Sequence, residues 1–263
     1  QLAYTLDPAG NVDYLQDQLN GTFSRDYAYD VLNRLKWDSG VSAGNPTYTY
    51  DDNGNRLTRT AGSGFPAQTI SYVAGKNRMS TYNSTAVSYD GMGNVTNSGN
   101  NLTATTEVNG RLLTATVPNS RRVTLLYNGL GEMARARTET RSGNQWTTPY
   151  WEYASFAPDG RALGLIQENT SRTEWEWVWV DNLPVVQFQD SYNSSGTYTG
   201  TTVTYLHPDQ LGTPRIGTST AGAISWRYRS DGFGVATISG THTVRLRLPG
   251  QIDLGTGGIN YNY

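Results

Sequence analysis

A short pattern that recurs roughly every 20 residues constrains this chain more than any other feature of its sequence. The pattern is an aromatic residue, an aspartate and a turn that contains glycine or asparagine. It opens at Tyr29, Tyr50, Tyr72 and Tyr89, with spacings of 21, 22 and 17 residues. Two short strands and two turns need about this length. The pattern therefore predicts a structural unit used many times, a β-hairpin, and not a single binding motif.

Further copies extend the pattern along the chain. "YNGLGEM" at 127–133 begins with Tyr127, and in "LDPAGNV" at 6–12 a leucine replaces the aromatic residue. The looser copies are "VNGRLL" (108–113), "APDGRAL" (157–163), "WVDNLPV" (179–185) and "SDGFGV" (230–235). No clear linker interrupts them, which predicts a continuous array of hairpins.

Each position of the repeat has a mechanical role. Tyr50 ends the incoming strand, and Asp51 accepts backbone N–H groups in an Asx-type turn. Gly54 supplies the positive φ of the turn, and Asn55 tolerates the same conformation. Arginines at matching places, as at Arg56, are expected to lie across a neighbouring tyrosine ring. The residues assigned to the repeat motif are Tyr29, Asp30, Tyr50, Asp51, Gly54, Asn55, Arg56, Tyr72, Tyr89, Asp90, Gly93 and Tyr127.

Composition and residue alternation both favour an all-β fold. The chain has 29 Gly, 18 Tyr and 7 Trp, and only 16% of its residues are charged, which suits strands and tight turns. A helix is conceivable only at 131–141, where alternation again favours a strand. The longest loop is expected at 190–200. In the segment 173–180 the tryptophans share one face, and in 243–249 Arg245 and Arg247 are expected to face water opposite an apolar face.

Charge and cysteine content exclude several classes of function. The formal net charge is −2 and the pI is near 5.7, so nucleic acid is not an expected partner. Arg121-Arg122 and "RART" at 135–138 are predicted to lie on solvated strand faces. With no cysteine, disulfides and thiolate metal sites are excluded. We expect no membrane span, because no stretch has the ~18 apolar residues needed. The chain begins with Gln1 and shows no signal peptide, as a mature product or a fragment would.

The strongest resemblance lies near the C-terminus. "YLHPDQLGTPR" (205–215), "ISWRYRSDGFG" (224–234) and "RLRLPGQIDLGTGGINYNY" (245–263) follow one another in the order found in the closing part of an Rhs core. Together with the hairpin units, they make the chain resemble the YD repeats of Rhs-type proteins, of toxin-complex C subunits and of teneurins. The residues that carry this part of the resemblance are His207, Asp209, Gly212, Pro214, Arg215 and Gly250.

The resemblance implies a curled, spiralling sheet of antiparallel hairpins that forms a shell or part of one. Residues 1–204 would be the repeat array, and 205–263 the closing segment of the same domain. In that family the shell encloses a C-terminal polypeptide, often a toxin, and the protein is exported or displayed at the cell surface. The expected partners are this polypeptide and further repeats of the parent protein.

Three departures from the family pattern are visible. The sequence ends at Tyr263, before the Arg-Tyr-Tyr-Asp-Pro segment and the Asp-Pro segment that the family links to self-cleavage. Gln210 stands where a second histidine is usual, and "SDGFG" replaces Tyr-Asp-Pro-Phe-Gly. No catalytic residue is therefore carried over to this chain.

Several candidate sites have a simpler structural explanation. "GVSAG" (40–44) matches a hydrolase elbow, but a helix should follow and Pro46 does instead. "HPD" (207–209) could serve acid–base or metal chemistry, but two histidines in all favour a turn corner. Asp51, Asp52, Asn53 and Asn55 miss the spacing of a calcium loop. We expect no metal and no cofactor.

One pair of glutamates and one row of tryptophans remain as candidate carbohydrate sites. Glu174 and Glu176 share a strand face and could act as paired glycosidase carboxylates, although such pairs normally come from different strands. Trp175, Trp177 and Trp179 could stack on sugar rings, or could form the covered face of the sheet, which large aromatic residues favour.

The leading hypothesis is thus a non-enzymatic shell segment that encloses or displays a polypeptide. The alternative is an extracellular adhesion or glycan-binding module that uses exposed aromatic rows. An enzyme is the third reading.

Overall fold

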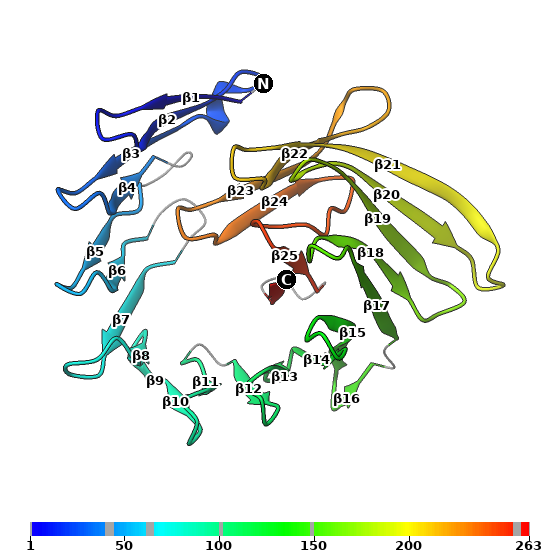
Figure 1. Ribbon diagram of the computed structural model, residues 1–263, viewed down its shortest axis with the longest axis horizontal. Helices are drawn as coiled ribbons and strands as arrows, with labels where there is room; N and C mark the ends of the chain where they lie inside the picture. Colours follow the sequence, from blue (N-terminus) through cyan, green and yellow to red (C-terminus); the bar gives the residue numbers. More distant parts are fainter. Residues whose placement is uncertain are drawn as a thin grey trace. The chain divides into compact units, whose positions relative to one another are not determined.

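The computed structural model describes residues 2–39, 45–61, 66–99, 102–147, 150–254 and 259–262. Within these ranges the fold is all-β, as predicted, and the only helical turn is the 3-10 turn Gly21–Phe23 (Figure 1). The segment 131–141 contains a strand, β15 (Met133–Ser142). No described helix has the length and apolar character that crossing a membrane requires.

Contacts divide the chain into two units. The first unit is Gln1–Asn101 with Ser230–Thr237, and the second is Leu102–Arg229 with Ile238–Tyr263. The boundary expected at 204/205 marks a change of sequence motif and falls inside strand β21 (Tyr198–Pro208).

The first unit is a series of antiparallel strands, and within each of its sheets neighbouring strands are consecutive along the chain. Its four-stranded sheet is β1 (Leu2–Leu6), β2 (Val12–Asp17), β3 (Arg25–Tyr29) and β4 (Leu35–Asp38). Its five-stranded sheet is β5 (Tyr48–Tyr50), β6 (Arg56–Arg59), β7 (Gln68–Tyr72), β8 (Met79–Tyr82) and β9 (Thr85–Ala86). The hairpin β10 (Ser88–Tyr89) and β11 (Val95–Asn97) follows.

The segment Ser230–Thr237 joins the first unit through buried charges. Asp231 forms an ion pair with Arg59, and both side chains are fully buried. The carboxylate of Asp38 accepts the Gly232 N–H at 3.0 Å and the Tyr48 hydroxyl at 3.0 Å, and it pairs with Arg25 at 2.9 Å. Burial and the carboxylate of Asp38 raise the pKa of Tyr48 far above its ordinary value.

The second unit is one antiparallel sheet followed by a C-terminal segment. The strands of its sheet, again in chain order, are β12 (Thr103–Thr106), β13 (Leu112–Val117), β14 (Arg121–Tyr127), β15, β17 (Trp151–Phe156), β18 (Ala162–Gln167), β19 (Thr173–Val180), β20 (Leu183–Tyr192), β21, β22 (Pro214–Thr218) and β23 (Ile224–Ser230). The short strand β16 (Gln145–Trp146) pairs with β15, β24 (Ala236–Gly240) borders β23, and β25 (Gln251–Asp253) pairs with β26 (Asn260–Asn262).

One turn connects most of these strands. The N–H of its first residue donates to the carbonyl four residues on, and the fourth residue donates back to the first, as in Asp51 with Asn55 and Gly54. The fourth residue has a positive φ, 84° at Gly54 and 89° at Gly93, as expected for a type I turn with a G1 bulge. This turn starts at Asp7, Asp30, Asp51, Asp90, Glu107, Asn128, Ala157, Asn193, Asp209, Ser219 and Asp231.

The turn corrects two expectations. Asn55 does not share the left-handed conformation of Gly54; its amide donates instead to the Asp51 carboxylate at 2.9 Å and to Asn77 at 2.9 Å. The long loop expected at 190–200 is wrong as well. Asn193 takes the place of the aspartate and Gly196 has φ 74°, so the segment is a tight hairpin between β20 and β21.

Tyrosines of the repeat link successive hairpins within each unit. Each hydroxyl donates to a backbone carbonyl of the preceding hairpin, as Tyr50 does to Leu35 at 2.6 Å and Tyr127 to Leu112 at 2.7 Å. The same link joins Tyr29 to Val12, Tyr72 to Arg56 and Tyr89 to Met79. The repeat is therefore defined by a contact between neighbours, in addition to its own turn.

Arginines cover the rings from the preceding repeat, as predicted. Arg34 lies 4.7 Å from the ring centroid of Tyr50, and Arg78 lies 4.2 Å from that of Tyr89. At Arg56 the expected tyrosine is wrong: the guanidinium lies 4.1 Å from the ring centroid of Phe233, which belongs to the segment Ser230–Thr237.

Candidate functional site on the inner face of the second unit

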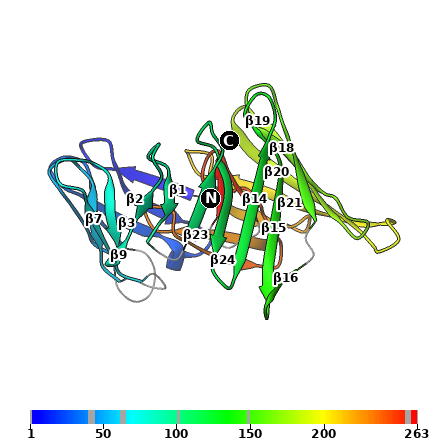
Figure 2. The same ribbon diagram turned by 90° about the horizontal axis from the view of Figure 1, so that it is seen from below.

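The sheet of the second unit curls around the chain's own C-terminal segment (Figures 1 and 2). We call residues 243–254 the inner segment. Its buried apolar side chains, Val244, Leu246, Ile252 and Leu254, join one core with the inner face of the sheet. That face contributes Val123, Leu125, Met133, Ala136, Leu165, Trp175, Trp177, Leu206, Trp226 and Tyr228. The inner face is therefore an apolar surface that holds a polypeptide lacking extended pairing with the sheet.

The tryptophan row of β19 belongs to this covered face. Trp175 is 5% exposed and Trp177 4% exposed. The indole N–H of Trp177 donates to Gln187 at 3.0 Å, and that of Trp179, which is half-buried, donates to the Ala162 carbonyl at 2.8 Å. The rings of Trp175 and Trp177 offer no free face for a sugar. Glu176 is exposed and Glu174 pairs with Arg172 at 2.6 Å, on the opposite side of the strand.

A buried ion pair anchors the inner segment. Arg245 donates to both carboxylate oxygens of Glu152 in β17, at 2.9 and 2.8 Å, with only 6% and 8% of the two side chains exposed. Its guanidinium lies 4.6 Å from the ring centroid of Trp175. Burial alone would lower the pKa of Arg245, but the hydrogen bonds and charge of Glu152 outweigh it and hold the pKa above its ordinary value. The arginine is thus charged and fully paired in the interior.

The second buried arginine, Arg247, has its carboxylate partner inside the inner segment itself. Its guanidinium pairs with Asp253 at 2.5 Å, and 7% of its side chain is exposed. Burial lowers the pKa of this group below its ordinary value, and Asp253 opposes the shift. The loop is closed further by Arg245, which donates to the Asp253 carbonyl at 2.7 Å.

These arginines overturn the strand predicted at 243–249. That prediction placed Arg245 and Arg247 in water, and it is wrong because the segment is not a strand of an open sheet. Among the described residues, 243–249 form a single isolated bridge, Leu246 with Ile252, and residues 244–247 are buried. Alternation of apolar and charged residues here reflects two covered sides, one apolar and one lined with carboxylates.

Polar side chains of the sheet form hydrogen bonds with the backbone of the inner segment. Gln187, fully buried, donates to the Thr243 carbonyl at 2.6 Å and accepts from the Arg245 N–H at 3.1 Å. The Thr138 hydroxyl donates to the Leu254 carbonyl at 2.8 Å. Nothing in the sequence patterns marked Gln187 or Glu152, because each acts on residues far along the chain.

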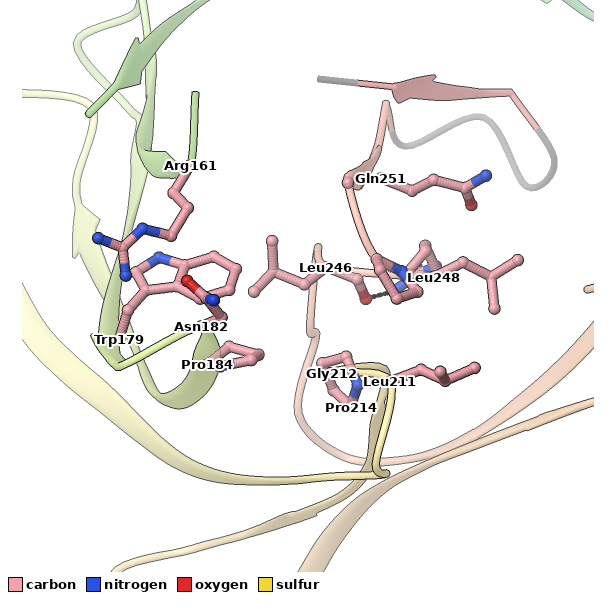
Figure 3. A pocket seen from close by; sticks show the side chains of 13 residues that line it. Arg161, Trp179, Asn182, Pro184, Leu211, Gly212, Pro214, Leu246, Leu248 and Gln251 are labelled. Carbon is pink, nitrogen blue, oxygen red and sulfur yellow. Dashed lines mark hydrogen bonds between the residues drawn. The ribbon is translucent and has the colours of Figure 1, made fainter. Parts of the chain in front are cut away.

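A small cavity of about 180 Å³ lies between the sheet and the inner segment (Figure 3). Trp179 and Pro184 line it on one side, and Leu246 lines the other, together with the turn that holds Gly212 and Pro214. The cavity is mostly apolar, and it marks a place where the inner segment and the sheet are not closely packed.

The residues of the core-like motif serve turns. Asp209 is buried, accepts the N–H groups of Leu211 and Thr213, and pairs with Arg215 at 2.8 Å. His207 is exposed and shares a hydrogen bond of 3.0 Å with Thr218. Gly212 and Gly250 have φ values of 89° and 76°. The corner predicted at "HPD" thus depends on the aspartate.

The candidate metal sites of the sequence are not formed in the described part of the chain. Within it, no three His, Asp or Glu side chains are grouped to hold a metal ion. The carboxylate of Asp51 is occupied by Asn55, whose backbone and side-chain nitrogens both donate to it. The elbow motif at 40–44 lies outside the described residues.

Hairpins linked in series, with a sheet in the second unit that curls around part of the same chain (Figure 1), are what the resemblance to YD repeats implies. No family model and no curated protein matches the sequence. Solved structures do: a chain of the Photorhabdus luminescens Tc holotoxin pore matches with a TM-score of 0.74 and 16% identity over 97% of this chain. The TcdB2-TccC3-TEV crystal structure matches with a TM-score of 0.77 and 16% identity over 99%. TcdB2-TccC3 without its hypervariable C-terminal region gives 0.69 and 15% over 97%.

These matches confirm the predicted fold and, at the level of fold, the resemblance to YD-repeat shells. The chain spans only 14% to 15% of the length of the matched chains. The match is therefore to one stretch of each of these longer chains.

Proposed function

We propose that this chain is a non-enzymatic segment of a YD-repeat shell in an exported bacterial Rhs-type protein, and that its sheet encloses a polypeptide, typically a C-terminal toxin. The observation that carries the proposal is the inner segment itself. An inner face that already buries an irregular segment with two paired arginines has the chemistry needed to hold a polypeptide. The likeness to Tc toxin structures supports the same role.

The mechanism is physical. An enclosed chain cannot reach its folded, active state or meet a target while the wall surrounds it. The inner face supplies apolar surface for burial and fixed hydrogen-bond partners, such as Gln187, for backbone groups that water no longer reaches. Further repeats of the parent protein would complete the wall.

The test uses the direction in which the chain leaves the inner face. Ile259 and Tyr261 pack against the inner core, and the Tyr261 hydroxyl accepts the Met133 N–H at 2.9 Å. A polypeptide joined beyond Tyr261 would therefore start next to the inner face of the second unit's sheet. An unfolded, lysine-containing tag joined after Tyr263 should be cut by trypsin more slowly than the same tag placed before Gln1. Equal cleavage rates at the two ends would refute enclosure by this segment.

A further inference from the structure

The outer face of the second unit carries a cluster of arginines between aromatic rings. We call it the arginine–aromatic patch: Arg122, Arg135, Arg137, Arg141, Trp146, Trp151 and Tyr153. Strand register places these side chains on one face, because Arg137 is opposite Trp151 and Arg135 is opposite Tyr153. The intervening Ala136 and Glu152 point to the core. The arginines of the run at 135–138 therefore belong to an ordered cluster with aromatic rings, which the predicted solvated strand face did not include.

The rings hold the arginines in place. Arg135 lies 4.6 Å from the ring centroid of Trp151 and 5.8 Å from that of Tyr153. Arg122 and Arg141 lie 5.0 and 5.7 Å from the ring of Trp146. A stacked guanidinium keeps the N–H groups at its edges free for anions, and fixing it in advance lowers the entropy that binding costs.

Positive charge exceeds negative charge on this patch. Its one carboxylate, Glu139, is shared between Arg122 at 2.6 Å and Arg137 at 3.0 Å. Arg135 donates to the Tyr153 hydroxyl and Arg141 to the Gly143 carbonyl, and among the described residues neither has a carboxylate in ion-pair range. Glu168, which accepts from Tyr153 at 3.2 Å, lies at the edge. This local excess occurs in a chain whose net charge is −2.

The arginines form a row, and hydroxyl groups lie beside it. Arg135, Arg137 and Arg141 are on one strand, so their Cα atoms are spaced by about 7 and about 13 Å along it. Register continues the same face into Thr124, Thr114 and Thr105. The surface thus combines a row of cations of about 20 Å with a row of neutral hydroxyl groups.

We propose that the arginine–aromatic patch binds an anionic polysaccharide with sulfate or carboxylate groups. Planar guanidinium groups bind such anions through paired hydrogen bonds, and the threonine hydroxyls match the hydroxyl groups of sugars. Single-stranded nucleic acid fits less well, because bases need free ring faces for stacking and arginines cover these rings. The patch faces away from the inner segment, so this binding is independent of enclosure.

The experiment measures binding of a heparin dodecasaccharide to the full chain by calorimetry at several salt concentrations. The variant Arg135→Gln/Arg141→Gln removes the two arginines without a carboxylate partner, so no buried charge is stranded. We expect its affinity to fall about tenfold or more, with a weaker salt dependence. Arg172→Gln, on the same sheet but paired with Glu174 and stacked on Tyr192, is the matched control and should bind like the unaltered chain.

Three results would overturn the proposal. The first is no heparin binding at low salt, and the second is equal affinity for the double variant and the unaltered chain. The third is a single-stranded oligonucleotide of matched charge that binds as tightly as heparin, which would mark a general polyanion surface. Circular dichroism of each variant establishes that the fold is intact.

Discussion

The ion pair between Arg245 and Glu152 offers the sharpest test of how the inner segment is held. The change is Glu152→Gln, which keeps the shape of the side chain and removes its charge. Gln can still accept one of the two N–H groups that Arg245 now donates at 2.9 and 2.8 Å. The second N–H group and the positive charge are left without a partner in a site where only 6% of the arginine side chain is exposed.

The structure sets the size of the effect. Breaking a buried pair by removing one member typically costs about 3–5 kcal/mol, and the retained hydrogen bond places this change near about 3 kcal/mol. Replacing both members, as in Glu152→Gln/Arg245→Met, removes the stranded charge and leaves an apolar side chain on Trp175. The double variant should therefore be clearly more stable than Glu152→Gln alone.

Two assays report the result. Six of the seven tryptophans lie in the second unit, so urea unfolding followed by fluorescence reports mainly on that unit. Trypsin provides a local readout, because it cuts after Arg245 and Arg247 once the inner segment detaches. A loss of about 3 kcal/mol should raise this cleavage by about a hundredfold where reclosing is fast.

The control is Asp159→Asn, since Asp159 and Arg161 form an ion pair whose side chains are 50% and 33% exposed. That variant should change neither assay measurably. If Glu152→Gln behaves like Asp159→Asn, or if the double variant is no more stable than Glu152→Gln, the inner segment is not held by this pair.

Two further predictions concern the repeat. Gly93→Ala should lower the free energy of unfolding by roughly 1–2 kcal/mol because Gly93 has φ 89°. Gly91→Ala in the same turn should be neutral or slightly stabilising, and an added Cβ would meet no atom within 4 Å at either site. Equal urea midpoints for the two variants would refute the backbone argument. Burial raises the pKa of Tyr127 to about 12, above the unfolded value near 10. Its contribution to stability is therefore complete below pH 10 and is lost as pH rises toward 12. Tyr127→Phe should flatten this alkaline fall in urea midpoints, and identical pH profiles would contradict the assignment.

The hairpins could be predicted from the sequence because their determinants are local. An aspartate whose carboxylate accepts the backbone N–H groups two and four residues further on and a glycine with positive φ together fix the turn within five residues. The same local determinants are present at Asn193, where asparagine replaces aspartate and its side-chain oxygen accepts the N–H groups of Ser195 and Thr197. Residues 193–197 therefore form the same turn as the aspartate-led repeats, in place of the expected loop at 190–200.

The candidate site could not be predicted in the same way because its determinants are distant in sequence. Arg245 meets Glu152 across 93 residues, and Gln187 meets Arg245 across 58. Periodicity assigns a face to each residue of a segment, but it assumes that one face is wet. Residues 244–247 are all buried, so the alternation at 243–249 does not mark one buried face and one solvated face.

The buried polar side chains that make these contacts also make the inner face selective for the segment that it binds. Glu152 is buried and faces the core, so a segment without a cation at the place of Arg245 would leave this carboxylate without an ion-pair partner, with only the Gln167 side chain, among the described residues, donating to it. Gln187, fully buried, likewise needs a backbone carbonyl and N–H at the spacing that Thr243 and Arg245 provide. A purely apolar surface would bind any apolar polypeptide. The inner face requires in addition a positive charge opposite Glu152 and a backbone carbonyl and N–H opposite Gln187. This part of the inner face therefore favours a segment that supplies a cation and backbone groups at these positions, and disfavours one that does not.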